Sequence, residues 1–225
     1  MNAARSKATV DGMALHNRRN MMWLLVFALL IAIVASTLAR PGTPNLAEGE
    51  RLYAICAACH GVDGGGRAIG EIPVIAGQHA GVLKRQISAY RRGARWDVRM
   101  EHAAQIRRLG DDVAIADVAA YVASLPPPKS NQRGDGTNLA LGARLYAQRC
   151  RSCHGANGEG DSRTDAPRLA AQHHGYLQRQ FLDVLEDRRP ELGASHGAVM
   201  RGLDRAAIDG IADHLSRITP VKNSR

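Results

Sequence analysis

Aromatic residues are scarce in this sequence, which limits the core that side chains alone can build. Only 4% of the 225 residues are aromatic, with two phenylalanines and two tryptophans in the whole chain. A chain of this length forms one large domain or two small ones. Small domains often depend on a metal or cofactor for stability. We therefore expect a flat, mostly apolar group to fill part of the interior.

A basic surface interleaved with aromatic residues is also lacking, although the net charge is +9. Five of the 30 basic residues lie in the first forty positions, where Asp11 is the one acid, and the rest of the chain has 25 basic and 20 acidic residues. Nucleic-acid binding needs clustered basic residues with stacking partners. Nucleic acid is therefore excluded as an expected partner.

Cysteine is limited to four residues, and none is left for a disulfide. The four belong to two Cys-x-x-Cys-His runs, made of Cys56, Cys59 and His60, and of Cys150, Cys153 and His154. This run lets two thiols bond to the vinyl groups of one haem while the adjacent histidine binds the iron. A thioredoxin-like pair would need strands, and a structural zinc site would need a fourth ligand. We predict two covalently bound haem c groups.

The two runs belong to a duplicated unit. CAACHG recurs as CRSCHG 94 residues later, GERLYA recurs as GARLYA, and PVIAGQH recurs as PRLAAQH. Three prolines at 126–128, followed by a polar stretch containing glycine, predict a linker. We predict a leader at 1–40, a first domain at 41–125, a linker at 126–137 and a second domain at 138–225.

Apolar spacing within each unit is helical, and no alternation typical of strands stands out. The expected helices cover 46–53, 82–90 and 115–125 in the first unit, and 139–146 and 208–218 in the second. The sequence therefore predicts an all-α fold with two tandem domains.

Methionine is the expected sixth ligand of each iron. Four of the six methionines lie in the first 22 positions, which leaves Met100 and Met200. A thioether sulfur raises the reduction potential and closes the open coordination position, which suits electron transfer. Aligning the two last helices places Met100 opposite Ala194, so Met200 is out of register. His196 is the alternative ligand and would make the second haem bis-histidine.

A proximal histidine needs a partner for its second ring nitrogen. Pro73 and Pro167 each lie thirteen residues after the ligating histidine, and we predict that their carbonyls supply it. His214 stands where the first unit has Tyr121 and is interpreted as a helix-packing residue. Three further histidines open a helix and are interpreted as capping or surface groups, namely His79, His173 and His174.

An uncharged apolar stretch covers residues 21–39 and is long enough to cross a bilayer as a helix. Most of the nearby basic residues precede it, which predicts that the bulk of the chain lies outside the cytoplasm. The stretch is longer than that of an ordinary signal peptide, so we favour an uncleaved anchor. Cleavage after Ala39 is the alternative.

From Leu46 onwards the chain resembles the dihaem class I cytochromes c of the cytochrome c4 type. The segments that carry the resemblance are GERLYAICAACHG, PVIAGQH and IADVAAYVASL in the first half, and GARLYAQRCRSCHG, PRLAAQH and IDGIADHLSRI in the second. The resemblance implies two helical haem domains, histidine and methionine ligation, and a place in the bacterial periplasm or on the outer face of the inner membrane. The change from tyrosine to His214 predicts a weakened contact between the first and last helices.

Three functions follow from these features. The first is an electron carrier, not an enzyme, that takes single electrons from a quinol-oxidising complex or another donor and passes them to a terminal oxidase, without a small-molecule substrate. The second is a dihaem peroxidase, which needs an open sixth position on one haem. The third is a haem subunit fixed in a membrane dehydrogenase or oxidase complex.

Overall fold

The structure is a computed structural model and describes Trp23, Phe27 and residues 42–220. Apart from Trp23 and Phe27, the expected membrane segment at 21–39 lies outside the described residues. Within the part that is described, no helix is both long enough and apolar enough to cross a membrane.

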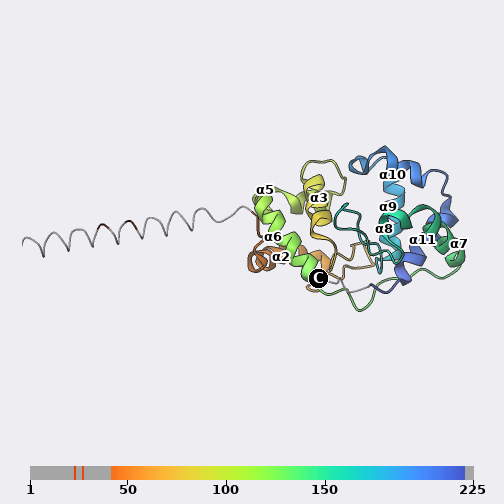
Figure 1. Ribbon diagram of the computed structural model, residues 1–225, viewed down its shortest axis with the longest axis horizontal. Coiled ribbons are helices and arrows are strands. Elements are labelled where there is room, and N and C mark those ends of the chain that lie inside the picture. Colours follow the sequence, from red (N-terminus) through yellow and green to blue (C-terminus); the bar gives the residue numbers. More distant parts are fainter. Residues whose placement is uncertain (1–22, 24–26, 28–41, 221–225) are drawn as a thin grey trace, which may run out of the picture. The chain divides into compact units, whose positions relative to one another are not determined.

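The first repeat contains five helices, which Figure 1 shows in orange to green. They are α2 (Leu46–His60), α3 (Ala80–Arg91), α4 (Val98–Ala104), α5 (Ile106–Leu109) and α6 (Asp112–Ser124). The side chain of Asn45 accepts a hydrogen bond from the Glu48 amide and starts α2, and Asp111 caps α6 in the same manner. The first helix extends beyond the expected 46–53, because no residue between Tyr53 and His60 interrupts a helix.

The second repeat follows the same order, in green to blue in Figure 1. It contains α7 (Leu139–Arg149), α8 (Arg151–His154), α9 (His174–Leu185), the 3₁₀ helix η1 (Pro190–Leu192), α10 (Gly193–Met200) and α11 (Arg205–Arg217). Here the first helix is interrupted at Cys150, so that the rest of the Cys-x-x-Cys-His run forms the separate turn α8. The residues that are described contain two isolated β-bridges and no longer strand, which confirms the helical prediction.

Two glycines explain how closely the first and last helices of each repeat pack. A Cβ atom at Gly49 would clash with the backbone oxygen of Asp117 in α6, and one at Gly142 would clash with the backbone oxygen of Gly210 in α11. Glycine therefore lets the helix backbones touch at α2–α6 and at α7–α11. This contact accounts for the glycine that opens both GERLY and GARLY.

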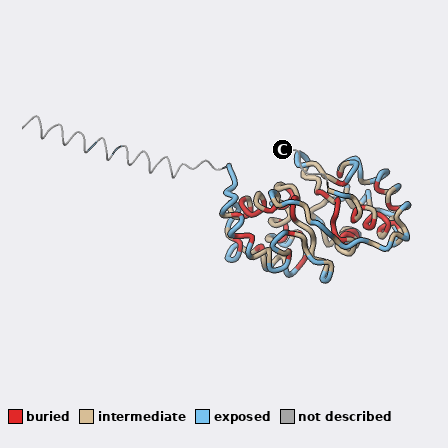
Figure 2. The backbone as a smooth tube through the Cα atoms, turned by 90° about the horizontal axis from the view of Figure 1, so that it is seen from below, coloured by how far each residue is buried: buried red, intermediate tan, exposed pale blue. Residues whose placement is uncertain are grey.

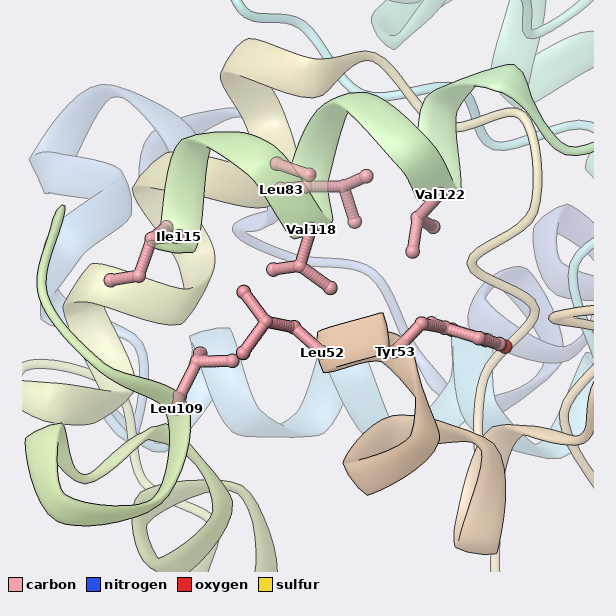
Figure 3. Close-up of a cluster of buried hydrophobic side chains, with 8 residues drawn as sticks. Leu52, Tyr53, Leu83, Leu109, Ile115, Val118 and Val122 are labelled. Atoms are coloured by element: carbon pink, nitrogen blue, oxygen red, sulfur yellow. The ribbon is translucent and has the colours of Figure 1, made fainter. Parts of the chain in front are cut away.

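Each repeat has its own apolar core beside the helix pair. In the first repeat Leu52 and Tyr53 of α2 point towards Val118 and Val122 of α6, and Leu83 joins them from α3 (Figure 3). In the second, Tyr146, Phe181, Ile211 and Leu215 take part in an equivalent cluster. Figure 2 shows these buried segments in red. Both cores are small, as the low aromatic content predicts.

The substitution at His214 keeps the contact that it was expected to weaken. The rings of Tyr53 and Tyr121 lie 5.4 Å apart at 51° in the first repeat. The rings of Tyr146 and His214 lie 5.5 Å apart at 48° in the second. The packing role predicted for His214 is therefore confirmed, and the predicted weakening is wrong, because an imidazole fits where the phenol ring would lie.

Candidate haem sites

The Cys-x-x-Cys-His motif of the first repeat occupies the last turn of α2, at the wall of a cavity of about 120 Å³. Cys56, Cys59 and His60 line this cavity together with apolar side chains from α3 and α6. All four cysteines of the chain are free thiols in the structure. Burial raises the pKa of the Cys56 thiol to about 11, and that of Cys150 also to about 11. Without a haem, both thiols would keep their protons at neutral pH.

His60 and His154 are held in one orientation by the same kind of contact. The Nδ1 atom of His60 lies 3.0 Å from the carbonyl oxygen of Pro73, and Nδ1 of His154 lies 3.0 Å from that of Pro167. A carbonyl oxygen only accepts, so Nδ1 donates and Nε2 keeps its lone pair. Burial lowers the pKa of both histidines, which favours the neutral ring that binds a metal.

A glycine in each motif loop lets the proline carbonyl approach its histidine. Gly66 has φ +70° and its amide donates to the His60 carbonyl at 2.8 Å. A Cβ at this position would clash with the backbone of Ile72 and Pro73. Gly160 takes the same place in the second repeat, with φ +73° and a 2.8 Å bond to the His154 carbonyl. Left-handed backbone in this tight contact requires glycine.

Met100 lies in α4 and lines the same cavity as Cys56, Cys59 and His60 of α2. Asp97 caps this helix by accepting from the amides of Arg99 and Met100, at 3.0 and 3.4 Å. Burial raises the pKa of Asp97, but hydrogen bonds from Arg99 and from Arg179 of α9 outweigh it and hold the pKa well below its usual range. The first turn of the methionine-bearing helix is therefore fixed by an ionised carboxylate.

The cavity of the second repeat is larger, about 280 Å³, and both Met200 and His196 line it. Met200 packs against the core cluster of this repeat. The ring centroids of His154 and His196 lie 6.2 Å apart, with their planes at 87°. No side chain caps α10, which carries both residues. The structure thus brings both sequence candidates to the second cavity.

The comparisons with known proteins agree with this geometry. The cytochrome c family model matches twice, at residues 46–126 and 139–218. The chain belongs to the cytochrome c family. Cytochrome c4 of Pseudomonas aeruginosa is 30% identical over 175 residues, which cover 75% of this chain and 85% of that protein.

The crystal structure of reduced cytochrome c4 from Pseudomonas stutzeri has a TM-score of 0.69 and 26% identity, and covers 79% of this chain and all of that one. A thiosulfate dehydrogenase electron acceptor of Stutzerimonas stutzeri is 27% identical over 191 residues, or 76% of this chain and 87% of that protein. These similarities identify a dihaem cytochrome of the c4 type, with two covalently bound haem c groups.

The residues of this cytochrome c fit such a group at both places. Each cavity combines two thiols and one oriented imidazole with mainly apolar walls. An apolar macrocycle would cover core residues such as Leu83 and Val118, which line the first cavity. Burying that surface is favourable, and it supplies the core that the scarce aromatic residues do not.

The AGQH and AAQH segments of this cytochrome c build an interface between the repeats. His79 Nε2 donates to the carbonyl of Glu159 at 3.0 Å, and His173 Nε2 donates to that of Gly65 at 2.9 Å. Neither histidine caps its helix through its side chain, and His173 is only 5% exposed. The interpretation of these two as capping or surface groups is therefore wrong, since each bridges to the other repeat. His174 instead contacts Asp209 of its own repeat at 3.0 Å.

Sequence reasoning missed two further sets of residues at the sites. The Tyr53 hydroxyl donates to the Gly61 carbonyl at 2.6 Å, and Tyr146 donates to that of Gly155 at 2.7 Å, which ties the end of each motif to the core. Gln78 and Gln172 join the repeats through their side-chain amides. Their repetition at equal places in both units was the signal that could have found them.

Proposed function

We propose that this chain is a membrane-anchored carrier of single electrons with one haem in each of two domains. The observation that carries the proposal is the pair of equivalent sites, each with two thiols and an imidazole fixed at 3.0 Å from a proline carbonyl. Haem iron supplies reversible one-electron chemistry between its ferric and ferrous states. Paired sites of this kind in one chain suit transfer without a small-molecule substrate.

The proposed covalent attachment uses Cys56 and Cys59 for the first haem, and Cys150 and Cys153 for the second. His60 and His154 are the proposed proximal ligands, with Pro73 and Pro167 holding their rings. Met100 and Met200 are the proposed sixth ligands, since each lines its cavity. If Met100 and Met200 bind the irons as proposed, no coordination position would be left for a substrate, which favours a carrier over a peroxidase.

The proposed domain limits are 41–125 and 138–225, with a linker at 126–137, and the ranges matched by the family model support them. We propose that residues 21–39 hold the chain to the inner membrane with both haem domains on the periplasmic side. Membrane fractions washed at high pH should retain the full chain. A variant that carries a cleavable signal in place of residues 1–40 should appear in the soluble periplasmic fraction.

Electrons would come from a quinol-oxidising complex or from a periplasmic dehydrogenase, and would leave to a terminal oxidase. The similarity to a thiosulfate dehydrogenase electron acceptor supports a dehydrogenase as a donor class. Stopped-flow reduction by isolated donors of each class would separate them. The productive donor should reduce the cytochrome faster at low ionic strength if charged surfaces guide their encounter.

The deciding experiment is an optical redox titration of the full chain, matured in a host that attaches haem c. We expect two haems per chain in the pyridine haemochrome assay and two one-electron steps. Rapid binding of peroxide or carbon monoxide to one haem would replace the carrier with a peroxidase. Co-purification in fixed ratio with a dehydrogenase or oxidase after mild detergent extraction would instead indicate a fixed subunit.

A further inference from the structure

The side-chain amides of Gln78 and Gln172 each bind the backbone of the opposite repeat through a pair of hydrogen bonds. Gln172 accepts from the Val74 amide and donates to the Val74 carbonyl, both at 2.8 Å. Gln78 accepts from the Arg168 amide at 2.9 Å and donates to the Arg168 carbonyl at 3.0 Å. Gln172 is only 8% exposed. The two contacts are equivalent and cross the interface in opposite directions.

The peptide group that each glutamine binds is the one that holds a proximal histidine. The Val74 amide belongs to the same peptide unit as the Pro73 carbonyl, which accepts from His60 Nδ1 at 3.0 Å. A continuous chain of hydrogen bonds therefore runs from His60 through one peptide unit to Gln172 of the second repeat. The Pro167–Arg168 peptide connects His154 to Gln78 of the first repeat in the same way.

Hydrogen bonds in such a chain polarise one another, by about 10–30% per bond. An acceptor on the peptide N–H makes the carbonyl of that peptide a stronger acceptor, and the histidine that donates to it gains anionic character. A more anionic proximal ligand favours the ferric state, because partners of a metal-bound histidine raise its basicity. Loss of the glutamine acceptor should therefore raise the reduction potential of the haem at the far end of the chain.

We propose that Gln172 and Gln78 are positioning residues that set the potential of the haem in the opposite repeat, Gln172 for the first haem and Gln78 for the second. This inference rests on the proposed function, since it requires His60 and His154 to bind iron. The reduction potential of each haem would then depend on the contact between the repeats, through the hydrogen bonds of its proximal histidine. A carrier in which the repeats separate would have higher potentials at both haems.

Two other contacts across the interface bind neither the Pro73–Val74 peptide nor the Pro167–Arg168 peptide. His79 binds the Glu159 carbonyl at 3.0 Å, and Arg85 of α3 binds Asp165 at 2.9 Å. Substitution of these residues weakens the interface but leaves both hydrogen-bond chains in place. His79→Ala is thus a matched control for any general loosening of the repeats.

The test is a crossed pair of variants, Gln172→Met and Gln78→Met, in the full haem-loaded chain. Methionine keeps nearly the same volume and removes both hydrogen bonds. Proton NMR of the haem methyl groups reports the oxidation state of each haem separately during a redox titration. Gln172→Met should raise the ferrous-to-ferric ratio of the first haem about threefold at a fixed potential, or about 28 mV at 59 mV per tenfold. Gln78→Met should raise this ratio for the second haem alone. His79→Ala should leave the ratio unchanged for both haems.

Equal shifts of both haems in each variant, or no shift in either, would overturn the inference while leaving the carrier function intact. The haem count per chain is measured first, because a chain without two haems would refute the proposed function itself. If the variants do not fold, hydrogen exchange on the unmodified protein decides. The amides of Val74 and Arg168 and the side-chain amides of both glutamines should exchange slowly, and exchange at free-amide rates would contradict the hydrogen-bond chains.

Discussion

The two haem cavities are alike on the side of the histidine and different on the side of the methionine. Both histidines lie 3.0 Å from a proline carbonyl, and both motifs are tied to the core by a tyrosine at 2.6 or 2.7 Å. On the methionine side, the Asp97 side chain caps the start of α4, whereas α10 has no side-chain cap and follows a 3₁₀ turn. The proximal half is thus duplicated almost unchanged, and the distal half has diverged.

This difference follows from how each half is specified. On the histidine side, glycine, proline and tyrosine hold fixed spacings within a short stretch of both units, and the glutamine contacts from the opposite repeat are equivalent as well. The distal half depends on helices of different length and on contacts between repeats, such as Arg179 to Asp97 at 3.1 Å. The two histidine contacts are equal although α4 and α10 differ.

The largest expected effect is a loss of stability in one repeat, caused by a substitution where its first and last helices pack together. Gly142→Ala places a Cβ against the backbone of Gly210, which cannot give way as a side chain would. We expect the second repeat to lose about 3 kcal/mol or more of stability, at the upper end of overpacking effects. Gly49→Ala should do the same to the first repeat. Chemical denaturation of each variant, followed by the NMR signals of the two haems, measures both.

Gly197→Ala is the control for these substitutions, because no atom lies within 4 Å of the added Cβ in the exposed helix α10. Alanine has a higher helix propensity than glycine by about 1 kcal/mol. The control should be neutral or stabilising. A Gly142→Ala variant as stable as this control would mean that α7 and α11 do not pack as closely as described.

The next expected effect concerns the methionine side of each cavity. We expect Met200→Ala to remove about half of the weak long-wavelength absorption that methionine gives to ferric haem. Met100→Ala should remove the other half, and His196→Ala should leave the band unchanged. The measurement is the absorption spectrum of the oxidised protein in each variant.

The alternative outcome is that His196, and not Met200, binds the second haem. If the unmodified protein has the band of a single haem and His196→Ala alters the second haem, that haem is bis-histidine. The 6.2 Å separation of the His154 and His196 rings makes this the alternative to test. A bis-histidine haem would also have the lower potential, because methionine raises it.

The helical class, the duplication and both motifs could be predicted from the sequence, because the residues that determine them lie close together and recur. The contacts across the interface could not: the repetition of Gln78 and Gln172 marks both residues, but it does not show that each binds the other repeat, as Gln78 binds Arg168, 90 positions away. His173 was misread for the same reason: its helix-opening position is visible locally, but its burial depends on the other repeat. The helices α4 and α10 were missed because they are short, with seven and eight residues.

The two repeats are also expected to differ in their stability towards acid. The buried Asp213 binds the amides of Gly134 and Gly136 at 3.0 and 2.8 Å, and Arg217 at 2.7 Å. Burial raises the pKa of Asp213, but the bond from Arg217 and the two amides outweigh it and lower the pKa overall. A carboxyl with a lowered folded pKa stabilises the protein above its unfolded pKa, about 3.9, and this is lost as the pH falls through the folded value.

Asp213→Asn should therefore destabilise the second repeat at neutral pH and flatten its loss of stability below about pH 4. The first repeat lacks this contact with the linker and should keep the same acid profile in the variant. Urea denaturation between pH 3 and 7, with the two haems followed separately, gives both profiles. An unchanged slope in the second repeat would show that the Arg217 contact does not hold Asp213 ionised.

The smallest expected effect concerns the histidine side of the cavity, which has the same contacts in both repeats. Tyr53→Phe and Tyr146→Phe each remove one hydroxyl that donates to a glycine carbonyl at the end of the motif. A lost hydrogen bond of this kind costs about 1 kcal/mol. Because the two contacts and their ring packing are nearly identical, we expect equal losses in the two repeats, measured by denaturant midpoints. Losses of stability that differ by more than about 1 kcal/mol would mean that the two tyrosine hydrogen bonds differ in strength. The difference between the repeats would then extend from the methionine side of the cavity to the histidine side.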